Sequence, residues 1–337
     1  MLGVLIFFHE LGHFLVAKWS GIRVEKFSLG FPPTLISKKL GETVYAVGVI
    51  PLGGYVKMAG DNPEENLTGK PWEFMSKPPW KRFFVIAAGP FMNFLLAVVI
   101  LAGLFYFRGE ELQQAYISEV LTGAPAETAG MMPGDHIVSV DGIEVGSTEE
   151  LINQVKDKIE QPIVIGWMHN EKLKSDTVVT FRDYAATADG DSVAVGKIGV
   201  TLGHAYKRLG LLASVGAGFE RTVFYTYKTF EFVGGFFSGK SKASDVGGPI
   251  FIAKIAGATA RAGIDILLEF MALLSVNLAV LNILPIPIFD GGHLVFLAVE
   301  KMKGSPPSLK IRLIAQQIGI AFILLLVIFI TFNDITR

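Results

Sequence analysis

The chain is organised around an apolar stretch near its start, which reads Val4-Leu5-Ile6-Phe7-Phe8-His9-Glu10-Leu11-Gly12-His13-Phe14-Leu15-Val16. Its large apolar residues predict a buried helix. On a helix of about 3.6 residues per turn, His9 and His13 are four positions apart and share one face, with Glu10 beside them. In this H-E-x-x-H arrangement two imidazoles bind Zn²⁺, and the carboxylate is the general base for a metal-bound water. We therefore take His9 and His13 as candidate zinc ligands and Glu10 as the candidate catalytic base.

The same residues have a second interpretation, in which this is a surface or core helix whose histidines hydrogen-bond to neighbouring groups. Ionisable side chains are costly in an apolar helix, and they persist mainly where they face a partner, a metal or a water-filled cavity. This cost favours the metal site.

The composition predicts a polytopic α-helical membrane protein. Of 337 residues, 51% are hydrophobic and only 18% are charged, and the mean hydropathy is +0.47, unlike an average soluble protein. The net charge of −1 indicates no nucleic-acid partner. The chain has no cysteine, which excludes disulfides and thiolate zinc ligands.

Four apolar segments predict membrane-spanning helices, because about 20 apolar residues suffice to cross a bilayer. The expected spans are about 1–20, 83–107, 266–289 and 313–332. They divide the chain into a first membrane half, 1–108, and a second, 263–337. Only eight residues precede His9, so either the site lies near that face of the membrane or leading residues are absent from this sequence.

The distribution of basic residues predicts the orientation. Lys and Arg are frequent in the short segments 21–82 and 290–312, which are therefore expected to be cytoplasmic. Four spans then place the long segment between the second and third spans outside the cytoplasm.

A membrane-associated β-hairpin is expected within residues 43–58. Two β-prone runs flank Pro51-Leu52-Gly53-Gly54, which has the composition of a turn. The hairpin is either a lid that packs against the helices or an open strand edge that pairs with an extended substrate. In the second case Gly53 and Gly54 are candidate substrate-binding residues.

The middle segment, 109–204, has the pattern of a small α/β domain. Residues 123–130 predict a short helix, and an alternating strand then ends in the turn Asp141-Gly142. This pattern resembles a PDZ domain, which implies a groove that receives a chain end or a strand. Ile198 and Gly199 are candidates for the rim of this groove, although a structural strand also explains them.

Residues 205–262 are expected to link the PDZ-like domain to the second membrane half. Apolar residues at spacings of three and four over 209–233 predict an amphipathic helix at the membrane interface. The glycine-rich run Asp245-Val246-Gly247-Gly248-Pro249-Ile250 predicts a break before the next helix.

A third metal ligand must come from elsewhere, since a catalytic zinc normally has three protein ligands and one open position. Pro285 and Pro287 are expected to break the third span, and a carboxylate at such a break, Asp290, is a natural third ligand. His293 and Glu300 are competitors. Alternatively, Asp290 caps the helix that follows.

Taken together, H-E-L-G-H in the first span, N-I-L-P-I-P-I-F-D-G-G in a later span and a PDZ-like domain between them resemble the bacterial site-2 protease family. The runs Gly89–Asn93 and Phe27–Phe31 also match family motifs. The resemblance covers essentially the whole chain and implies that His9, His13 and Asp290 bind zinc and that Glu10 is the base.

The resemblance also implies that Asn93 and Asn282 lie close to the substrate, although either asparagine could instead form a helix–helix hydrogen bond. The candidate substrate-binding residues are Asn93, Asn282, Pro285, Pro287, Gly53, Gly54, Ile198 and Gly199.

The expected function is that of a zinc endopeptidase in the bacterial inner membrane, acting in regulated intramembrane proteolysis. It would cleave transmembrane segments of single-span proteins, such as anti-sigma factors or signal-peptide remnants, after a site-1 protease has trimmed them. The alternative is a non-catalytic membrane scaffold whose PDZ-like domain recruits partner proteins.

Overall fold

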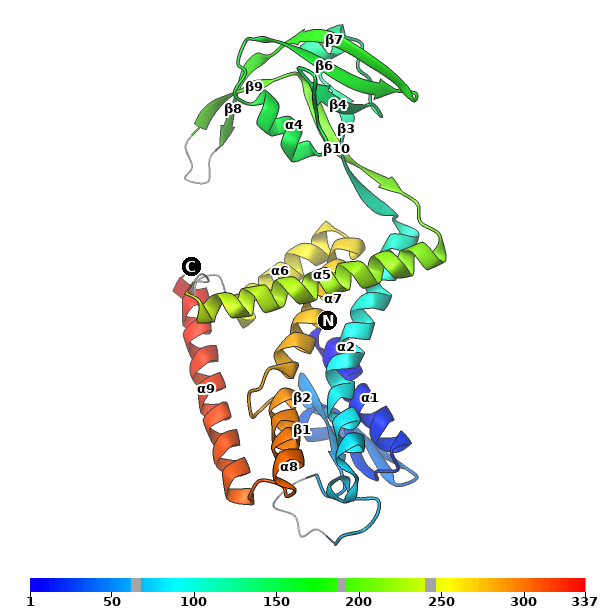
Figure 1. Cartoon of the computed structure of the whole chain (residues 1–337), viewed down its shortest axis with the longest axis vertical. Helices are drawn as coiled ribbons and strands as arrows, with labels where there is room; N and C mark the ends of the chain where they lie inside the picture. The colour runs from blue at the N-terminus through cyan, green and yellow to red at the C-terminus, as the bar shows by residue number, and fades with distance from the viewer. Residues whose placement is uncertain (62–67, 187–191, 240–246, 337) are drawn as a thin grey trace. The chain divides into compact units, whose positions relative to one another are not determined.

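The computed structural model describes residues 1–61, 68–186, 192–239 and 247–336. The chain forms two compact units (Figure 1). One is mainly helical and consists of Met1–Tyr106 with Gly210–Arg337, and the other is the β-rich segment Phe107–Leu209. The second unit is therefore inserted between two halves of the first.

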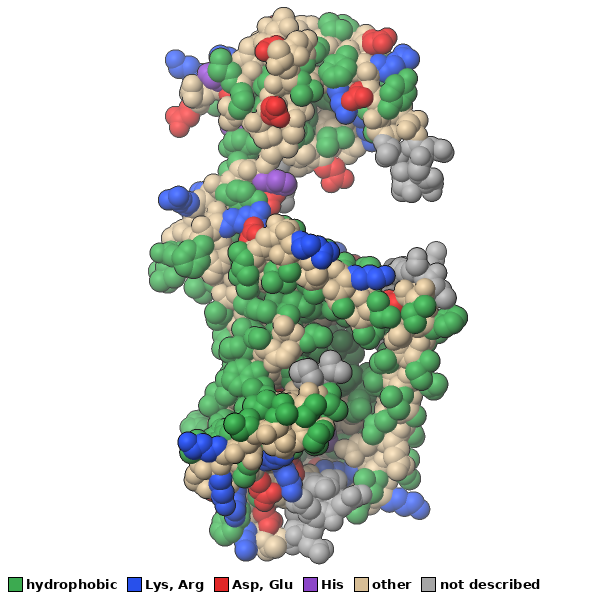
Figure 2. Space-filling view, turned by 180° about the vertical axis from the view of Figure 1, so that it is seen from behind, with side chains coloured by type: hydrophobic (Ala, Val, Ile, Leu, Met, Phe, Trp, Pro, Cys, Tyr) green, Lys and Arg blue, Asp and Glu red, His purple; other side chains and the backbone are tan. Residues whose placement is uncertain are grey.

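Within the described residues, four helices are long and apolar enough to cross a membrane. They are α1 (Leu2–Trp19), α2 (Pro79–Phe107), α7 (Ile264–Ile283) and α9 (Leu309–Thr336). Hydrophobic side chains cover much of the outer surface of this unit (Figure 2), as expected for a surface that faces lipid rather than water.

The third apolar helix ends earlier than the sequence analysis expected. Its span was placed at 266–289, but α7 ends at Ile283 and Leu284 has extended backbone angles. A residue before proline is pushed out of the helical region, and Pro285 has no backbone N–H to continue the helix. Residues 284–289 form turns, after which α8 (Asp290–Lys303) begins.

The expected linker, 205–262, contains two helices, α5 (Leu211–Phe237) and α6 (Pro249–Ala262). Tyr225 and Thr229 of α5 donate hydrogen bonds to Glu269 and Asn277 of α7, each at 2.8 Å. Burial and the Glu269 carboxylate raise the pKa of Tyr225 to about 12, so the phenol remains a donor at neutral pH. Polar contacts thus attach α5 to the spanning helix α7.

The glycine-rich break is only partly visible, because Asp245 and Val246 lie outside the described residues. Gly248 is the N-cap of α6. The Asp334 carboxylate accepts hydrogen bonds from the backbone N–H groups of Gly248 and Phe251, each at 3.0 Å. A carboxylate at a helix start satisfies free N–H groups, so the end of α9 holds the start of α6.

The hairpin has one more turn than expected. It consists of β1 (Val24–Leu40) and β2 (Thr43–Met58), with a turn at Gly41-Glu42, and the chain also reverses direction between Val47 and Gly54, as expected from sequence. Residues 26–29 pair with 54–57 on one side and with 44–47 on the other. The expected partners, 44–47 and 55–58, are therefore separated by a segment of β1.

Gly53 and Gly54 lie in β2 where the chain completes its reversal, and they also allow close packing. A Cβ at position 53 would lie 2.2 Å from the Phe31 ring, and one at position 54 would lie 2.8 Å from the Ser28 carbonyl oxygen. Glycine marks both turns and close backbone approach, and both explanations hold here.

The inserted unit contains a mixed α/β fold around one sheet. The strand order is β10-β3-β4-β6-β7, with β5 paired to β4. The strands are β3 (Glu110–Val120), β4 (His136–Val140), β5 (Ile143–Glu144), β6 (Pro162–His169), β7 (Lys172–Val179) and β10 (Val200–Lys207). A further hairpin is formed by β8 (Phe181–Ala186) and β9 (Ser192–Lys197), and the helices are α3 (Pro125–Thr128) and α4 (Thr148–Val155).

The core of this unit is built from the inward faces of the strands. Its largest fully buried side chains include Ile117, Ile137, Ile163 and Ile165, and Trp167 is 2% exposed. A small α/β unit with this sheet and two short helices fits the expected PDZ-like domain.

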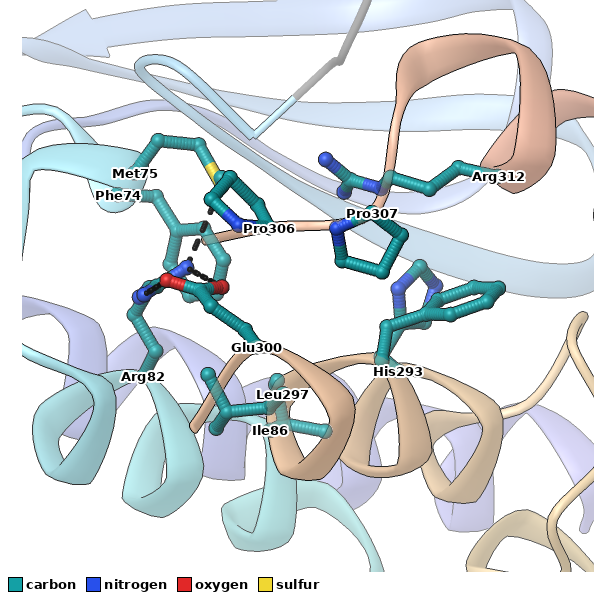
Figure 3. Close-up of a pocket in the computed structure, with 11 residues that line it drawn as sticks. Phe74, Met75, Arg82, Ile86, His293, Leu297, Glu300, Pro306, Pro307 and Arg312 are labelled. Atoms are coloured by element: carbon teal, nitrogen blue, oxygen red, sulfur yellow. Dashed lines mark hydrogen bonds and ion pairs between the residues drawn. The ribbon is translucent and has the colours of Figure 1, made fainter. Parts of the chain in front are cut away.

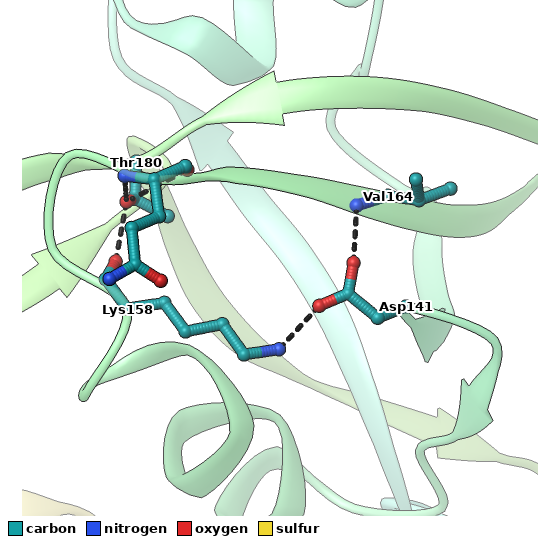
Figure 4. Close-up of polar contacts among 5 residues, drawn as sticks. Asp141, Lys158, Val164 and Thr180 are labelled. Carbon is teal, nitrogen blue, oxygen red and sulfur yellow. Dashed lines mark hydrogen bonds and ion pairs between the residues drawn. The ribbon is translucent and has the colours of Figure 1, made fainter.

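The turn Asp141-Gly142 joins β4 to β5, as expected from sequence. Asp141 has φ +51° and Gly142 has φ +79°, which suits a two-residue hairpin turn. The Asp141 carboxylate accepts a hydrogen bond from Lys158 Nζ at 2.5 Å and another from the Val164 N–H at 2.7 Å (Figure 4). These two donors, Lys158 first, hold the pKa of Asp141 below its usual range.

We expect Asp141→Asn to weaken this corner of the sheet, because asparagine keeps the turn conformation but loses the charge. For a partly exposed ion pair the loss is about 0.5–1 kcal/mol. The measurement is amide hydrogen exchange at Val164 in the intact protein, and exchange should be several-fold faster in the variant.

The control is Asp157→Asn, which removes a nearby exposed carboxylate with no hydrogen bond or ion pair to any described residue. The folded-state pKa of Asp141 is lowered. The difference in Val164 exchange rate between wild type and D141N should therefore be fully present above about pH 4 and should disappear as the pH falls through that folded-state pKa. Equal exchange in wild type and D141N at neutral pH would contradict this role.

Candidate metal centre

Helix α1 places two imidazoles together on one face. The Nε2 atoms of His9 and His13 are 3.2 Å apart. The Nδ1 atom of His13 lies 2.8 Å from the Val85 carbonyl oxygen of α2. A carbonyl oxygen only accepts, so Nδ1 carries the proton and the Nε2 lone pair is free for a metal.

Asn93 of α2 is placed to hold the proton of His9 on Nδ1, as the Val85 carbonyl does for His13. Its side-chain amide lies 3.4 Å from His9 Nδ1 and is fully buried. The Asn93 Oδ1 atom has no hydrogen-bond partner among the described residues. An amide can present its oxygen or its nitrogen in the same space, and with the oxygen toward His9 the Nδ1 proton is satisfied and Nε2 is free.

Asp290, at the start of α8, is brought to the two histidines. Its Oδ2 atom lies 3.2 Å from His9 Nε2 and 3.4 Å from His13 Nε2. The ligand atoms of the three residues all lie within 4.8 Å of one another.

The alternative role of Asp290 as a helix cap is wrong. The N-cap of α8 is Phe289, and it makes no side-chain capping bond. The Asp290 Oδ2 atom is buried without a hydrogen-bond partner in the described part of the chain, which is costly unless another group binds it. Two imidazole nitrogens and one carboxylate oxygen are a usual donor set for catalytic zinc, so these residues fit the ion.

The two competing residues have other surroundings. Glu300 forms an ion pair with Arg82, with donor–acceptor distances of 2.5 and 3.0 Å. His293 lines a pocket beside this ion pair. Neither belongs to the cluster of possible ligands found among the described residues.

Glycines make the convergence sterically possible. A Cβ at position 89 of α2 would lie 2.3 Å from His13 Nε2 and 2.7 Å from His9 Cε1. At position 291, after Asp290, a Cβ would lie 2.2 Å from the Ile283 and Leu284 carbonyl oxygens. A side chain at position 89 would therefore overlap the imidazoles, and one at position 291 would prevent the turn that carries Asp290.

Glu10 points from the same helix toward strand β2. A Cβ at position 54 would lie 3.3 Å from Glu10 Cγ, and the Val56 backbone lies close enough to interact with the Glu10 carboxylate. Glu10 therefore lies between the histidine–aspartate cluster and the backbone of β2.

The other sequence-based candidates are not all near this cluster. Asn282 is in the last turn of α7, and Pro285 and Pro287 lie in the turns between α7 and α8. Ile198 and Gly199 belong to the inserted unit. The Ile198 side chain is in its core, and the carbonyl groups of Ile198 and Gly199 accept bonds from Ala126 and Leu121 at 3.0 and 2.9 Å.

Two contributors to the site were missed from sequence. The Val85 carbonyl is a backbone group and has no sequence signal. Gly89 was noted only as part of a motif, and a glycine in the middle of a spanning helix was the available sign of close packing.

These features define a membrane-embedded protein with a buried site of metal-ligand composition. The sequence matches Peptidase family M50 over residues 1–326. The chain therefore belongs to peptidase family M50.

Individual relatives cover nearly the whole chain. A protein of Rhizobium meliloti (strain 1021), whose assigned name is that of a zinc metalloprotease, is 35% identical over 99% of this chain and 94% of its own length. The regulator of sigma-W protease RasP of Bacillus subtilis (strain 168) is 29% identical over 99% of this chain and 96% of its own length.

Among solved structures, the PDZ domain of the SdrC-like protein of Listeria monocytogenes is 24% identical and covers 27% of this chain and 87% of that chain, with a TM-score of 0.22.

We expect Gly89→Ala to disturb the site, because its methyl group would overlap both imidazoles. Such overpacking costs about 1–3 kcal/mol, and the variant should lose most of the metal that the wild type retains on purification. The control is Gly103→Ala on the same helix, where a Cβ meets no atom of the described residues within 4 Å. Metal analysis of the purified variants checks this, and equal metal content in wild type and G89A would contradict it.

Proposed function

We propose that this chain is an intramembrane zinc endopeptidase of the site-2 type that cleaves transmembrane segments of single-span membrane proteins. The observation that carries the proposal is the approach of Asp290 Oδ2 to both His9 and His13. These groups come from opposite ends of a chain that belongs to a peptidase family. A carboxylate and two imidazoles in apolar surroundings are costly to bury without a common ion.

In this proposal His9, His13 and Asp290 hold the zinc ion, and the Val85 carbonyl and Asn93 orient the two imidazoles. When bound, zinc polarises the scissile carbonyl group and lowers the pKa of a coordinated water toward about 7. The remaining chemistry belongs to the side chains of this chain.

Glu10 is the proposed general base. Its carboxylate takes a proton from the attacking water and later delivers a proton to the leaving amine. The carboxylate interacts with both histidines and with the Val56 backbone of β2. This position allows Glu10 to face both water and the peptide bond.

The segment 54–57 of β2 is the proposed place where an unwound substrate binds. In the described part of the hairpin it pairs with β1 on one side only, through residues 26–29. Its other side lies toward α1, since Gly54 approaches Glu10 and Ile6. A helical substrate must first unwind because its carbonyl groups are hydrogen-bonded, and a free strand edge offers replacement bonds.

The proposed surroundings of the substrate include both asparagines and the prolines after α7. Asn93 contacts His9, so its proposed role is to orient the His9 imidazole. Asn282, with Pro285 and Pro287, ends α7 just before the turn that carries Asp290. The broken backbone of 284–289 leaves polar groups available near the site.

We further propose that the protein lies in the bacterial inner membrane with 21–82 and 290–312 in the cytoplasm and the PDZ-like domain outside. Basic short loops support this orientation. The PDZ-like domain, at Ile198-Gly199, would receive chain ends released by an upstream site-1 protease. The name of the Bacillus subtilis relative, a regulator of sigma-W protease, supports a role in sigma-factor regulation, for which we propose anti-sigma factors as substrates.

We expect Glu10→Gln to lower the rate of cleavage of a model transmembrane substrate by about 100-fold or more, because general-base catalysis is lost. Glutamine keeps the size of the side chain, so the zinc content should remain that of the wild type. The assay uses the full chain in proteoliposomes. The control is Glu42→Gln, which removes an exposed carboxylate paired with Lys18, and undiminished cleavage by E10Q would remove Glu10 from the mechanism.

The ligand assignment makes a separate prediction about metal content. His9→Ala and Asp290→Ala should each reduce bound zinc from about one ion per chain to a small fraction, because only two protein ligands remain. His293→Ala removes the competing histidine and should retain zinc. Zinc content unaffected by either H9A or D290A would refute the assignment and would favour a scaffold over an enzyme, whereas loss of zinc only in H293A would make His293 the ligand.

A further inference from the structure

A small charged pocket lies in the helical unit beside the start of α2. Figure 3 shows it between the Arg82–Glu300 ion pair on one side and Arg312 with His293 on the other, under Pro306 and Pro307. Its cavity volume is about 30 Å³, which is room for about two water-sized groups. The space suits the oxygen atoms of one small anionic group.

The pocket has an excess of positive charge. Arg82 is 4% exposed and is neutralised by Glu300 through two hydrogen bonds. Arg312 is close enough to interact with both charges, yet its guanidinium has no hydrogen bond or ion pair to any residue within the described ranges. One positive charge is therefore left without a counter-charge there.

A buried donor in the wall is also unsatisfied. The Arg82 Nε atom has no hydrogen-bond partner in the described part of the protein. Buried guanidinium groups normally use their donors on acceptors. The pocket wall therefore contains the unused donor Arg82 Nε and the uncompensated positive charge of Arg312. A negatively charged hydrogen-bond acceptor would satisfy both.

The depth of the pocket indicates what that acceptor is. Arg82 and Arg312 each lie in the first turn of an apolar helix, α2 from Pro79 and α9 from Leu309. With 28 residues, α9 is about 42 Å long, which exceeds a hydrocarbon core of about 30 Å. Its first turn therefore reaches the level of the lipid phosphates. Trp80, 57% exposed, is typical of this layer.

We propose that this pocket binds the phosphate group of an anionic phospholipid. The Arg312 guanidinium donates charge-assisted hydrogen bonds to the phosphate oxygens, and the unused Nε donor of Arg82 lies in the same wall. Basic pockets between helices at a membrane face are suited to such headgroups. Inorganic phosphate shares this chemistry and is the other source to distinguish. The proposal does not depend on peptide cleavage or on zinc.

Because the phosphate joins α2, α8 and α9 where Arg82, Glu300 and Arg312 meet, we expect bound lipid to stabilise the helical unit. Phosphatidylglycerol should raise the unfolding temperature of the full-length protein above its value in phosphatidylcholine alone.

The test measures phosphatidylglycerol retained by the purified full chain, by native mass spectrometry from nanodiscs of mixed phosphatidylcholine and phosphatidylglycerol. Arg312→Gln should retain at least about fivefold less than wild type. Lys310→Gln is the matched control, since it removes one exposed positive charge two residues away and outside the pocket. It should retain lipid nearly as wild type does.

Equal retention in R312Q and wild type would overturn the proposal, as would equal losses in R312Q and K310Q, which would indicate general surface attraction. Arg312→Lys keeps the charge but loses the planar fork, so intermediate retention is expected even if R312Q folds poorly. Millimolar inorganic phosphate separates the sources. If phosphatidylglycerol stays bound in the presence of phosphate, the lipid headgroup is the ligand. If phosphate displaces the lipid and alone raises the unfolding temperature of the protein equally, the proposal of a lipid site is refuted.

Discussion

The structure depends on the meeting of three polar groups in apolar surroundings. Two imidazoles from α1 and the carboxylate of Asp290 point at one another although almost the whole chain separates them. Each group alone would be costly to bury. Close packing at two glycines brings these groups together. Gly12 lets α1 approach the Ala88 carbonyl of α2, and Gly291 lets the Asp290 turn lie against the end of α7.

The same arrangement explains why the neighbouring elements have their shapes. The helix α7 must end so that a carboxylate can turn inward, and Pro285 ends it. The α8 helix that carries Asp290 is then held at its other end by the ion pair of Arg82 with Glu300. Strand β2 lies next to Glu10. In the proposed function, this arrangement brings water, the base and an extended substrate backbone to one place, which peptide hydrolysis requires.

Local sequence patterns were enough for part of this arrangement. The pair His9 and His13 follows from helical periodicity, and the apolar helices follow from length and composition. The choice between ligand and helix cap for Asp290 could not be made locally, because both need a carboxylate at a helix start. The reversal before Gly54 was expected from sequence, but the position of residues 26–29 between its two arms was not, because it arises only when distant segments pair. Long-range contacts decide both cases.

The most direct test of the account is zinc X-ray absorption on the purified full-length protein. It should show one zinc ion per chain, with two imidazole nitrogens at about 2.0–2.1 Å and oxygen ligands at about 2.0–2.2 Å, and His9→Ala should lose most of this zinc signal. A spectrum without imidazole scattering, or one that is the same in wild type and H9A, would contradict the shared metal site.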